Sequence, residues 1–287
     1  MNISLYDRYG AMNSAPVFAS LAQGFDRLGH RVSYHDDSAD VAVIWSQLWA
    51  GRMLPNKGIF DQFTTSGRPV FVIEVGTLFR EHTWRVLLNG AHKFLVTGQD
   101  HTRARRRGLP CEPWRNRGDH LVIALQRPES QQWSGMPDTI TWLKQVIDSI
   151  RCYSDRKILI RPHPRLRDRI DVRHLPTSCQ IQSPMKLSST YDSFDFETAL
   201  DQAWAVINWN SNPGVVAVVR GVAAFVGADS LAAPVANLDL SLIESPTRPD
   251  RTQWINDLAW HEWTLEEFQS GEALIPVLAA INADRNS

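Results

Sequence analysis

One short apolar run that ends against two prolines constrains the fold more than any other part of the sequence. The run is Lys157 to Ile160, and the segment Arg161 to Arg165 (Arg-Pro-His-Pro-Arg) follows at once. A run this short and aliphatic is typical of a strand buried in a parallel sheet. Proline can neither donate to a sheet ladder nor continue a helix, so the strand must end there in an extended turn. Arg161, His163 and Arg165 are therefore expected just past the carboxyl end of a strand, where open α/β sheets bind ligands.

Strand-like and helix-like segments alternate along most of the chain, which is typical of parallel sheets with right-handed crossovers. The expected strands are residues 2–5, 31–35, 40–45, 69–75, 93–96, 120–125, 157–160, 180–182, 205–209 and 223–226. The expected helices are residues 14–28, 58–65, 80–88, 138–151, 252–260 and 265–283, with a further one beginning near Val215. The predicted fold class is therefore α/β.

One arginine-rich segment, residues 101–118, interrupts this alternation. It also holds glycine and prolines, and we interpret it as a linker between two α/β halves. The 287 residues are enough for two domains of ordinary size. The prediction is a Rossmann-like domain over 1–100, a linker over 101–118, and a second Rossmann-like domain over 119–287 that includes the C-terminal helices. Two such halves should form a cleft where their strand ends face each other.

The composition excludes several classes of protein. Hydrophobic residues make up 43% and charged residues 21% of the chain, which is typical of a globular protein. The formal net charge of −1 gives no overall attraction to nucleic acid or membranes. Cys111, Cys152 and Cys179 show no CxxC spacing, no leader sequence is recognised, and no apolar run approaches the roughly 18 residues of a membrane span. We therefore expect a soluble protein of the reducing cytoplasm.

A second polar turn follows the expected strand 205–209. It reads Asn210-Ser211-Asn212-Pro213-Gly214, and a helix follows. Ser211 or Asn212 is suited to cap that helix and Pro213 to its first turn, so backbone N–H groups should point at a bound anion. The alternative is that these asparagines are ordinary turn residues and that the arginines of the first turn are solvated charges.

A third turn, Gln126-Arg127-Pro128-Glu129-Ser130, also comes directly after an expected strand. Arg127 and Ser130 could reach a phosphate or a base, and a plain polar loop is the alternative. Further along the chain, Asp192 and Asp195 could bind ribose hydroxyls, although Asp195 could equally cap a helix.

Missing motifs narrow the chemistry further. The sequence contains no GxGxxG, GxxxxGK[ST], HExxH or GxSxG, which lowers the case for dinucleotide-binding, P-loop, zinc-protease and α/β-hydrolase proteins. It also contains no Asp-x-Asp, the usual carboxylate pair for a metal-held nucleotide diphosphate. We therefore expect no bound metal and no resident cofactor, with cations and helix dipoles neutralising any bound phosphate.

Taken in order, the three turns carry a resemblance. The series strand–Gln-Arg-Pro, strand–Arg-Pro-His-Pro, strand–Asn-Ser-Asn-Pro-Gly–helix resembles the donor half of GT-B glycosyltransferases. It is most similar to the capsule-polysaccharide (Kdo-transferase-like) group, and it also resembles proteins of this length encoded by bacteriophages. The similarity covers residues 120–227 by motif and the first half by architecture only.

The resemblance implies a glycosyltransferase with two Rossmann-like domains, in which the second domain binds a nucleotide sugar. The cationic turns and the missing Asp-x-Asp predict that the transfer is metal-independent. It implies that Arg161 and His163 contact the donor phosphate and that Ser211, Asn212 and Gly214 close over it. The other residues that we assign to donor binding are Gln126, Arg127, Ser130, Arg165, Asn210 and Asp195. Because the group's usual Ser/Thr pair is replaced here by Asn210-Ser211-Asn212, the base of the donor nucleotide is left open.

The first domain should then bind the acceptor and supply the base that takes the proton of the acceptor hydroxyl. Glu74 is the first candidate, because it lies at the carboxyl end of an otherwise apolar strand and is soon followed by Gly76. Asp7, at the end of the first strand, is the second candidate. A carboxylate at a strand end can equally be a structural hydrogen-bond acceptor.

The identity of the acceptor rests on the arginines of residues 101–118. Those assigned to it are Arg103, Arg105, Arg106, Arg107 and Arg115. Clustered arginines suit a polyanion, and the resemblance allows double-stranded DNA with a hydroxymethylated base, as in phage DNA β-glucosyltransferases. The alternatives are a saccharide acceptor with the arginines in a solvated linker, a non-catalytic nucleotide- or nucleic-acid-binding module, and a nucleotide-sugar epimerase of similar fold.

Overall fold

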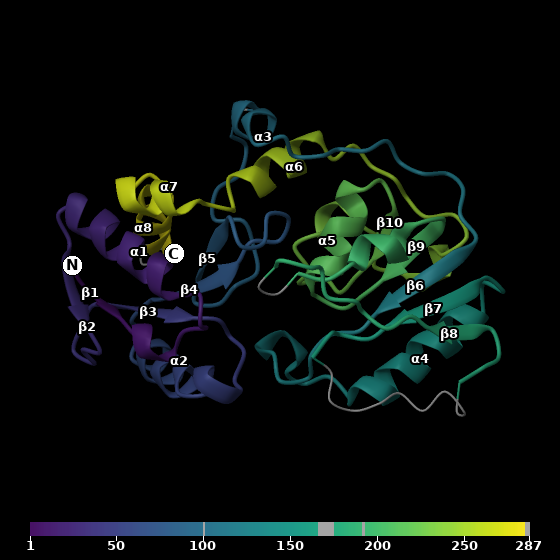
Figure 1. The fold of residues 1–287 in the computed structure, drawn as a ribbon, viewed down its shortest axis with the longest axis horizontal. Helices are drawn as coiled ribbons and strands as arrows, with labels where there is room; N and C mark the ends of the chain where they lie inside the picture. Colours follow the sequence, from purple (N-terminus) through teal and green to yellow (C-terminus); the bar gives the residue numbers. More distant parts are fainter. Residues whose placement is uncertain (100, 166–174, 191–192, 285–287) are drawn as a thin grey trace. The chain divides into compact units, whose positions relative to one another are not determined.

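The computed structural model describes residues 1–99, 101–165, 175–190 and 193–284, and the chain divides into two compact units. Unit 1 comprises residues 1–100, 129–131 and 257–287. Unit 2 comprises residues 101–128 and 132–256. Within the described ranges, each unit is built on one five-stranded sheet (Figure 1).

The sheet of unit 1 has the strand order β2-β1-β3-β4-β5 (Figure 1). Its strands are β1 (Asn2–Leu5), β2 (Arg31–Tyr34), β3 (Val41–Trp45), β4 (Val70–Val75) and β5 (Trp84–Leu88). Strand β1 pairs in parallel with β2 and β3, and β3 pairs in parallel with β4. The apolar runs of the first half therefore form the parallel sheet that their alternation with helices predicted.

Strand β5 corrects a prediction, because residues 80–88 were expected to be helical. All five residues of β5 are buried, and they pair antiparallel with β4 from Val75 opposite Trp84 to Phe71 opposite Leu88. Burial on both faces removes the polar alternation that would identify a strand, so its apolar content fits either type of element. The expected strand over 93–96 is also wrong, since the chain is irregular there.

Helices cover both faces of this sheet. On one face, α1 (Ala15–Arg27) packs with α7 (Leu265–Ser270) and α8 (Leu274–Asp284) against the strands. Its buried side chains Val17, Phe18, Leu21 and Phe25 recur at helical spacing, which produces one apolar stripe. On the other face, α2 (Asn56–Thr65) buries Ile59 and Phe63.

The C-terminal helices belong to unit 1, whereas the sequence analysis placed them in the second domain. Phe268 and Leu274 are fully buried in the same cluster as α1, and in Figure 1 the yellow α7 lies beside the purple α1. The single helix expected over 265–283 is two helices, because Gly271 ends α7 with φ of +87°. A capping box between Thr264 and Glu267 starts α7.

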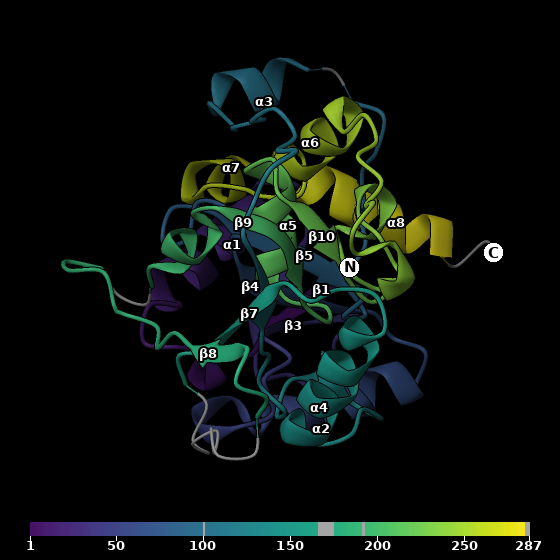
Figure 2. The ribbon, with the colours of Figure 1, turned by 90° about the vertical axis from the view of Figure 1, so that its right-hand side faces the viewer.

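The sheet of unit 2 has the order β10-β9-β6-β7-β8, and its pairs are parallel throughout the described residues. Its strands are β6 (His120–Ala124), β7 (Lys157–Arg161), β8 (Cys179–Ile181), β9 (Ala203–Ile207) and β10 (Ala223–Phe225). Helix α4 (Thr139–Arg151), capped by Asp138 as its position predicts, packs on one face. Helix α5 (Asn212–Val219) contacts β9 and β10 on the other side of the sheet (Figures 1 and 2).

Residues 101–118, which the sequence predicts to be a linker between two domains, group with unit 2. The segment contains the short helix α3 (Thr102–Arg106). The backbone N–H of Glu112 donates to the Val219 carbonyl at 3.1 Å, and that of Arg115 donates to the Gly221 carbonyl at 2.7 Å. These bonds fix the second half of the segment to the last residue of α5 and to the turn that follows it.

The remaining helix, α6 (Thr252–Ala259), spans the boundary at residues 256 and 257. Among the residues that the structure describes, no helix has the length and apolar content needed to cross a bilayer.

Each sheet has a point at which the strand order reverses: between β1 and β3 in unit 1, and between β6 and β9 in unit 2. Loops that leave the carboxyl ends of adjacent parallel strands diverge at such a point, and α/β proteins bind their ligands there.

Candidate functional site

The reversal point of unit 2 is cross-linked by one buried amide side chain. Gln126 follows β6, and its Oε1 accepts a hydrogen bond from the backbone N–H of Asn210, which follows β9, at 3.1 Å. Its Nε2 donates to Oε1 of Gln132 at 3.3 Å. Two residues that the sequence assigned to donor binding are thus brought together, and Gln126 holds the two strand-end loops in register.

Helix α5 begins at this same point without a side-chain cap. Ser211 is the N-cap residue, as predicted, but its hydroxyl lies 2.6 Å from the Asn208 amide and does not bond to the first turn. With the Asn208 amide oriented so that Oδ1 accepts from the Ser211 hydroxyl and from Trp209 N–H at 3.1 Å, its Nδ2 donates to Ser211 O at 3.0 Å. Pro213 has no N–H, and the Gly214 N–H donates to the Ser211 carbonyl at 3.4 Å, so what this end offers an anion is the positive pole of the helix dipole.

Gly214, in the first turn of α5, is required by space. A Cβ built there would lie 2.8 Å from Val226 Cγ1 and 3.0 Å from the Asn208 amide group. Any larger residue would therefore push against the Asn208 side chain that engages Ser211.

Arg161, the last residue of β7, is buried and forms an ion pair with Asp195, which is buried as well. Its Nη1 also donates to the Ser183 carbonyl at 3.3 Å. Burial alone would raise the pKa of Asp195, but hydrogen bonds from the Met185 N–H and from Arg161 outweigh it and hold that pKa below its usual value. Asp195 starts a short 3-10 helix without capping it through its side chain, so the capping alternative is wrong, and its contact is with Arg161.

The remainder of the Arg-Pro-His-Pro-Arg turn lies past the carboxyl end of β7, as predicted. His163 is half-buried, and its Nδ1 accepts a hydrogen bond from the backbone N–H of Arg165 at 3.1 Å. The acceptor role of Nδ1 places the ring hydrogen on Nε2 in the neutral form. Arg165 is exposed and Arg127, after β6, is half-buried. Asp192 lies outside the described residues.

Ser130 differs from its prediction, because it groups with unit 1 and not with the other donor residues. It forms a bridge with Leu48, and Gln131 Oε1 accepts from the Trp49 indole N–H at 2.7 Å. Residues 129–131 are therefore bound to the segment that follows β3.

Glu74 lies at the carboxyl end of β4, and one of its oxygens already accepts two hydrogen bonds. Oε1 accepts from the Ser46 hydroxyl and from the backbone N–H of Gln47, both at 3.0 Å. Arg85 is its partner across the β4–β5 ladder. The carboxylate therefore joins the ends of β3 and β4, as the structural alternative for a strand-end acid requires. Its catalytic role stays a prediction.

Asp7 lies past the end of β1, and its Oδ1 is 2.8 Å from Nε2 of His35, which follows β2. Near these residues, the reversal point of unit 1 is fixed by Asn56. Its fully buried Nδ2 donates to the Tyr9 carbonyl at 3.2 Å and to the Trp45 carbonyl at 2.6 Å. The loop after β1 and the end of β3 are thus held together by one side chain. The sequence analysis named Asp7 and missed His35 and Asn56.

Arg85 interacts electrostatically with Glu74 and Glu262, and these three residues form a largely buried charged cluster in unit 1. Arg85 is 6% exposed, and Glu262, 3% exposed, accepts hydrogen bonds from the Thr77 N–H at 2.6 Å and the Thr83 hydroxyl at 2.7 Å. Burial, and then the charge of Arg85, lower the pKa of His92 to about 3 and the pKa of His261 well below 6.5. Both imidazoles are therefore neutral in the folded protein at neutral pH.

These two histidines predict acid sensitivity. Below pH 6.5 these two histidines become protonated in the unfolded chain and stay neutral in the folded protein. The free energy of unfolding should therefore fall as the pH drops from 6.5 towards 3. Each histidine contributes a slope of at most about 1.4 kcal/mol per pH unit in that window and nothing above it. Urea unfolding at pH 7, 6 and 5 measures this slope. His92→Gln and His261→Gln should flatten it, and the same change at the exposed His82 should not; equal slopes in all four proteins would contradict the prediction.

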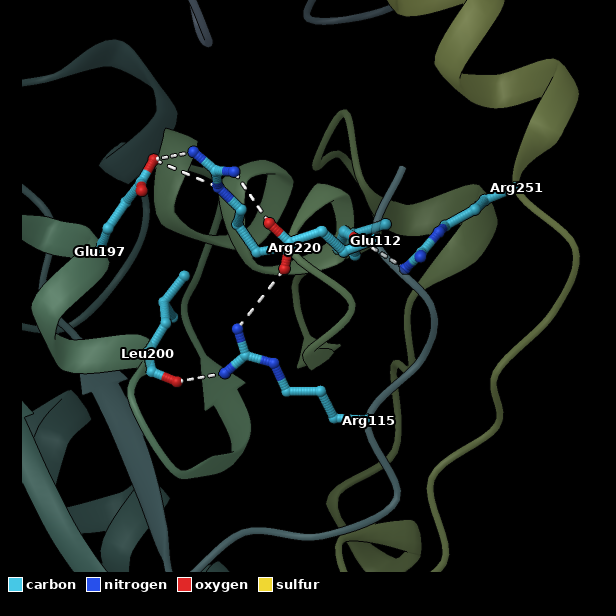
Figure 3. Close-up of polar contacts among 7 residues, drawn as sticks. Glu112, Arg115, Glu197, Leu200, Arg220 and Arg251 are labelled. Atoms are coloured by element: carbon cyan, nitrogen blue, oxygen red, sulfur yellow. Dashed lines mark hydrogen bonds and ion pairs between the residues drawn. The ribbon is translucent and has the colours of Figure 1, made fainter. Parts of the chain in front are cut away.

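The arginines assigned to the acceptor do not share one exposed surface. Arg105 and Arg106 are exposed and Arg107 is half-buried, whereas Arg103 is only 2% exposed. Arg115 donates to the Leu200 carbonyl at 2.5 Å and lies 3.7 Å from Glu112 (Figure 3). Arg220 forms ion pairs with both Glu112 and Glu197 (Figure 3). Glu112 therefore lies against two guanidinium groups, those of Arg115 and Arg220. Beside it, Arg251 donates to the Val218 carbonyl and stacks on Trp114 at 3.9 Å.

In the part of the chain that the structure describes, no three His, Cys, Asp or Glu side chains gather closely enough to hold a metal ion.

Comparisons with known proteins agree with this architecture. No protein-family model matches the sequence, and no curated protein sequence matches it. The solved structure of a Thermosulfurimonas dismutans KpsC, beta Kdo 2,4 transferase, is similar over 92% of this chain and 92% of its own, with a TM-score of 0.54 and 11% identity. The KpsC, beta Kdo 2,7 transferase, of the same organism is similar over 97% and 99%, with a TM-score of 0.52 and 13% identity. The chain has the GT-B fold.

This finding confirms the predicted fold class of two Rossmann-like α/β domains. It also confirms, at the level of the fold, the resemblance to Kdo-transferase-like proteins. At 11–13% identity, the similarity concerns the fold alone and leaves the roles of individual residues as predictions.

Proposed function

We propose that the protein transfers a sugar from a nucleotide sugar to an acceptor hydroxyl, with the donor bound at the reversal point of unit 2. The observation that carries this proposal is the first turn of α5, which starts there without a side-chain cap. The two similar KpsC structures are described as Kdo transferases, so glycosyl transfer is the activity that this fold supports best.

The chemistry of this edge suits a phosphate. The positive pole of the α5 dipole attracts an anion, and the segment that follows β7 adds the imidazole of His163 and the guanidinium of Arg165. Such groups stabilise the charge that develops on the phosphate as the sugar leaves. We propose that they do so without a metal ion, as the absence of Asp-x-Asp suggests.

Unit 1 supplies the acceptor site in this proposal. Its carboxyl edge carries the two predicted catalytic carboxylates, Glu74 and Asp7, either of which could serve the proton transfer that acceptor attack requires. We take a saccharide hydroxyl as the acceptor, because Arg103 is buried and Arg115 is bonded within unit 2. We also propose that the protein carries out this reaction in the cytoplasm.

The activity can be tested with a panel of UDP-, GDP-, dTDP- and CMP-linked sugars and saccharide acceptors, with products identified by mass spectrometry. We expect one donor to be consumed equally with and without EDTA. His163→Gln should weaken binding of that donor by about 1.5–3 kcal/mol, which is roughly 10- to 150-fold, because a charge-assisted hydrogen bond is lost.

The matched control is His120→Gln, because His120 lies at the amino end of β6, away from the carboxyl ends of the strands. It should leave donor affinity unchanged. A strict requirement for Mg²⁺ or Mn²⁺ would refute metal independence. A donor that binds and is never consumed would favour a non-catalytic module, and conversion without any acceptor would favour an epimerase.

DNA remains the second candidate acceptor, because Arg105 and Arg106 are exposed. Phosphate contacts release counterions, so log affinity falls with log salt by about 0.9 per contact. For a saccharide transferase we expect replacement of Arg105, Arg106 and Arg107 by alanine to leave the salt dependence of binding to hydroxymethylated duplex DNA unchanged. A slope reduced by about three in the triple variant would restore DNA as the acceptor.

A further inference from the structure

The carboxyl edge of unit 1 holds a histidine that the sequence analysis did not assign. Strands β1 and β2 are parallel and in register, with Leu5 opposite Tyr34. The next residues of both strands therefore leave the sheet side by side. This register brings His35 to Asp7, with 2.8 Å between Nε2 and Oδ1.

The contact determines which ring nitrogen can accept a proton. A carboxylate oxygen can only accept, so Nε2 of His35 carries the hydrogen and donates it to Asp7. Nδ1 then keeps a lone pair, and it has no hydrogen-bond partner among the described residues. The His35 side chain is 18% exposed, so a small molecule at this edge can reach it.

The imidazole is held more tightly than a surface ion pair requires. The rings of Tyr6 and Tyr9 meet it edge-on, with centroids at 5.4 and 5.7 Å. Tyr6 is itself buried and donates to Asp37 at 2.7 Å, while the Tyr9 carbonyl is bound by Asn56. Asp7, Tyr6 and Tyr9 together therefore fix one orientation of the His35 ring.

The backbone of His35 is strained as well. Its φ is +52°, a region that favours glycine and is unfavourable for other residues. Its N–H donates to the Leu5 carbonyl at 3.3 Å, which ties the strained residue to the end of β1. Strained residues with a fixed side chain are found preferentially at functional sites.

From this geometry we infer that His35 is the general base of the transfer, and that Asp7 is the residue that positions it. The inference rests on the proposed function and names the base for it. A lone pair of the acceptor oxygen attacks the anomeric carbon, and the bond from that carbon to the phosphate oxygen breaks with its electrons leaving on the nucleotide. The acceptor proton passes to Nδ1, and Asp7 stabilises the imidazolium until it releases the proton to water.

Glu74 fits this role less well. Its Oε1 accepts two hydrogen bonds that fix the end of β3, and Arg85 faces it across the ladder. Removing its charge would disturb the buried cluster as well as any chemistry. Glu74 is therefore assigned to positioning the edge, and Asp7, the second catalytic candidate of the sequence analysis, acts through His35.

The test uses His35→Gly, because glycine accepts the φ of +52° and leaves space where the imidazole was. With the donor that the wild type consumes from the panel above, kcat should fall by about 10²- to 10⁴-fold while donor affinity changes by less than about twofold. Imidazole added to the buffer should raise the kcat of His35→Gly at least about tenfold. Asp7→Asn should lower kcat by at least about tenfold, because the ring loses its fixed tautomer.

The matched control is His30→Gly, the same change at the other end of β2, which should keep the wild-type rate. The inference is overturned if His35→Gly keeps more than about a third of the wild-type kcat, or loses it without rescue by imidazole. Either result leaves the proposed function standing. A wild type that consumes none of the donors refutes the proposed function, and this inference with it.

Discussion

Arg161→Met should lower the free energy of unfolding of unit 2 by about 3–5 kcal/mol, the usual cost of leaving one member of a buried ion pair without its partner. Arg161 is 3% exposed and Asp195 is 7% exposed. Without the guanidinium, the Asp195 carboxylate keeps, among the described residues, hydrogen bonds from the Met185 N–H at 2.7 Å and the Thr198 hydroxyl at 3.3 Å. Urea unfolding, with hydrogen exchange to localise the change, measures the effect.

A double variant separates the lost charge balance from the lost packing. Asp195→Asn keeps an oxygen for the Met185 N–H and removes the unpaired charge, so combined with Arg161→Met it should recover part of the stability. Lys57→Met, which breaks the exposed pair with Asp61, should leave the unfolding curve in place. If Arg161→Met keeps full stability and loses donor binding, Arg161 is a ligand residue as the resemblance implied.

Local signals explain why most of the fold could be predicted from the sequence. The apolar run 157–160 followed by two prolines is β7 with its turn, and Asp138 caps α4 where the sequence placed the helix start. In both cases a few neighbouring residues decide the backbone. Strand β5 could not be recognised in this way, because burial of all five residues removes the alternation that marks a strand.

In the candidate site, too, the local features could be predicted from the sequence and the contacts between distant residues could not. Strand-end turns are local, so Gln126, His163 and Asn210 lie where the sequence placed them. Pairs distant in sequence were not predicted: Arg161 with Asp195, and Asp7 with His35. Such pairs depend on which strands are neighbours and in which register, and composition and spacing do not contain that information. A histidine as the last residue of the expected strand 31–35 was the one available signal for His35.

The assignment of the C-terminal helices failed for a related reason. Helix α7 is amphipathic and would suit a face of either sheet, so its sequence alone does not say which one it covers. What decides is the fit to α1, where Gly24 is buried against the carbonyl of Phe268. A glycine inside a helix was the only mark of this close approach in the sequence.

Gly24→Ala should therefore have the second large effect. A Cβ at residue 24 would lie 2.0 Å from the Phe268 carbonyl oxygen and 2.9 Å from Leu274 Cδ1. The first neighbour is backbone and cannot rotate away, so α7 must shift from α1. Alanine gains about 1 kcal/mol over glycine in a helix, but overpacking of a buried contact costs about 1–3 kcal/mol or more. The clash should win, and unit 1 should lose about 2 kcal/mol of stability.

Gly58→Ala isolates the propensity term, because glycine 58 lies in α2 with nothing within 4 Å of its added Cβ. It should stabilise unit 1 by about 0.5 kcal/mol. Hydrogen exchange should be faster in α1, α7 and α8 for Gly24→Ala and unchanged in these helices for Gly58→Ala. Equal stability of the two variants would mean that α7 does not pack on α1 at Gly24.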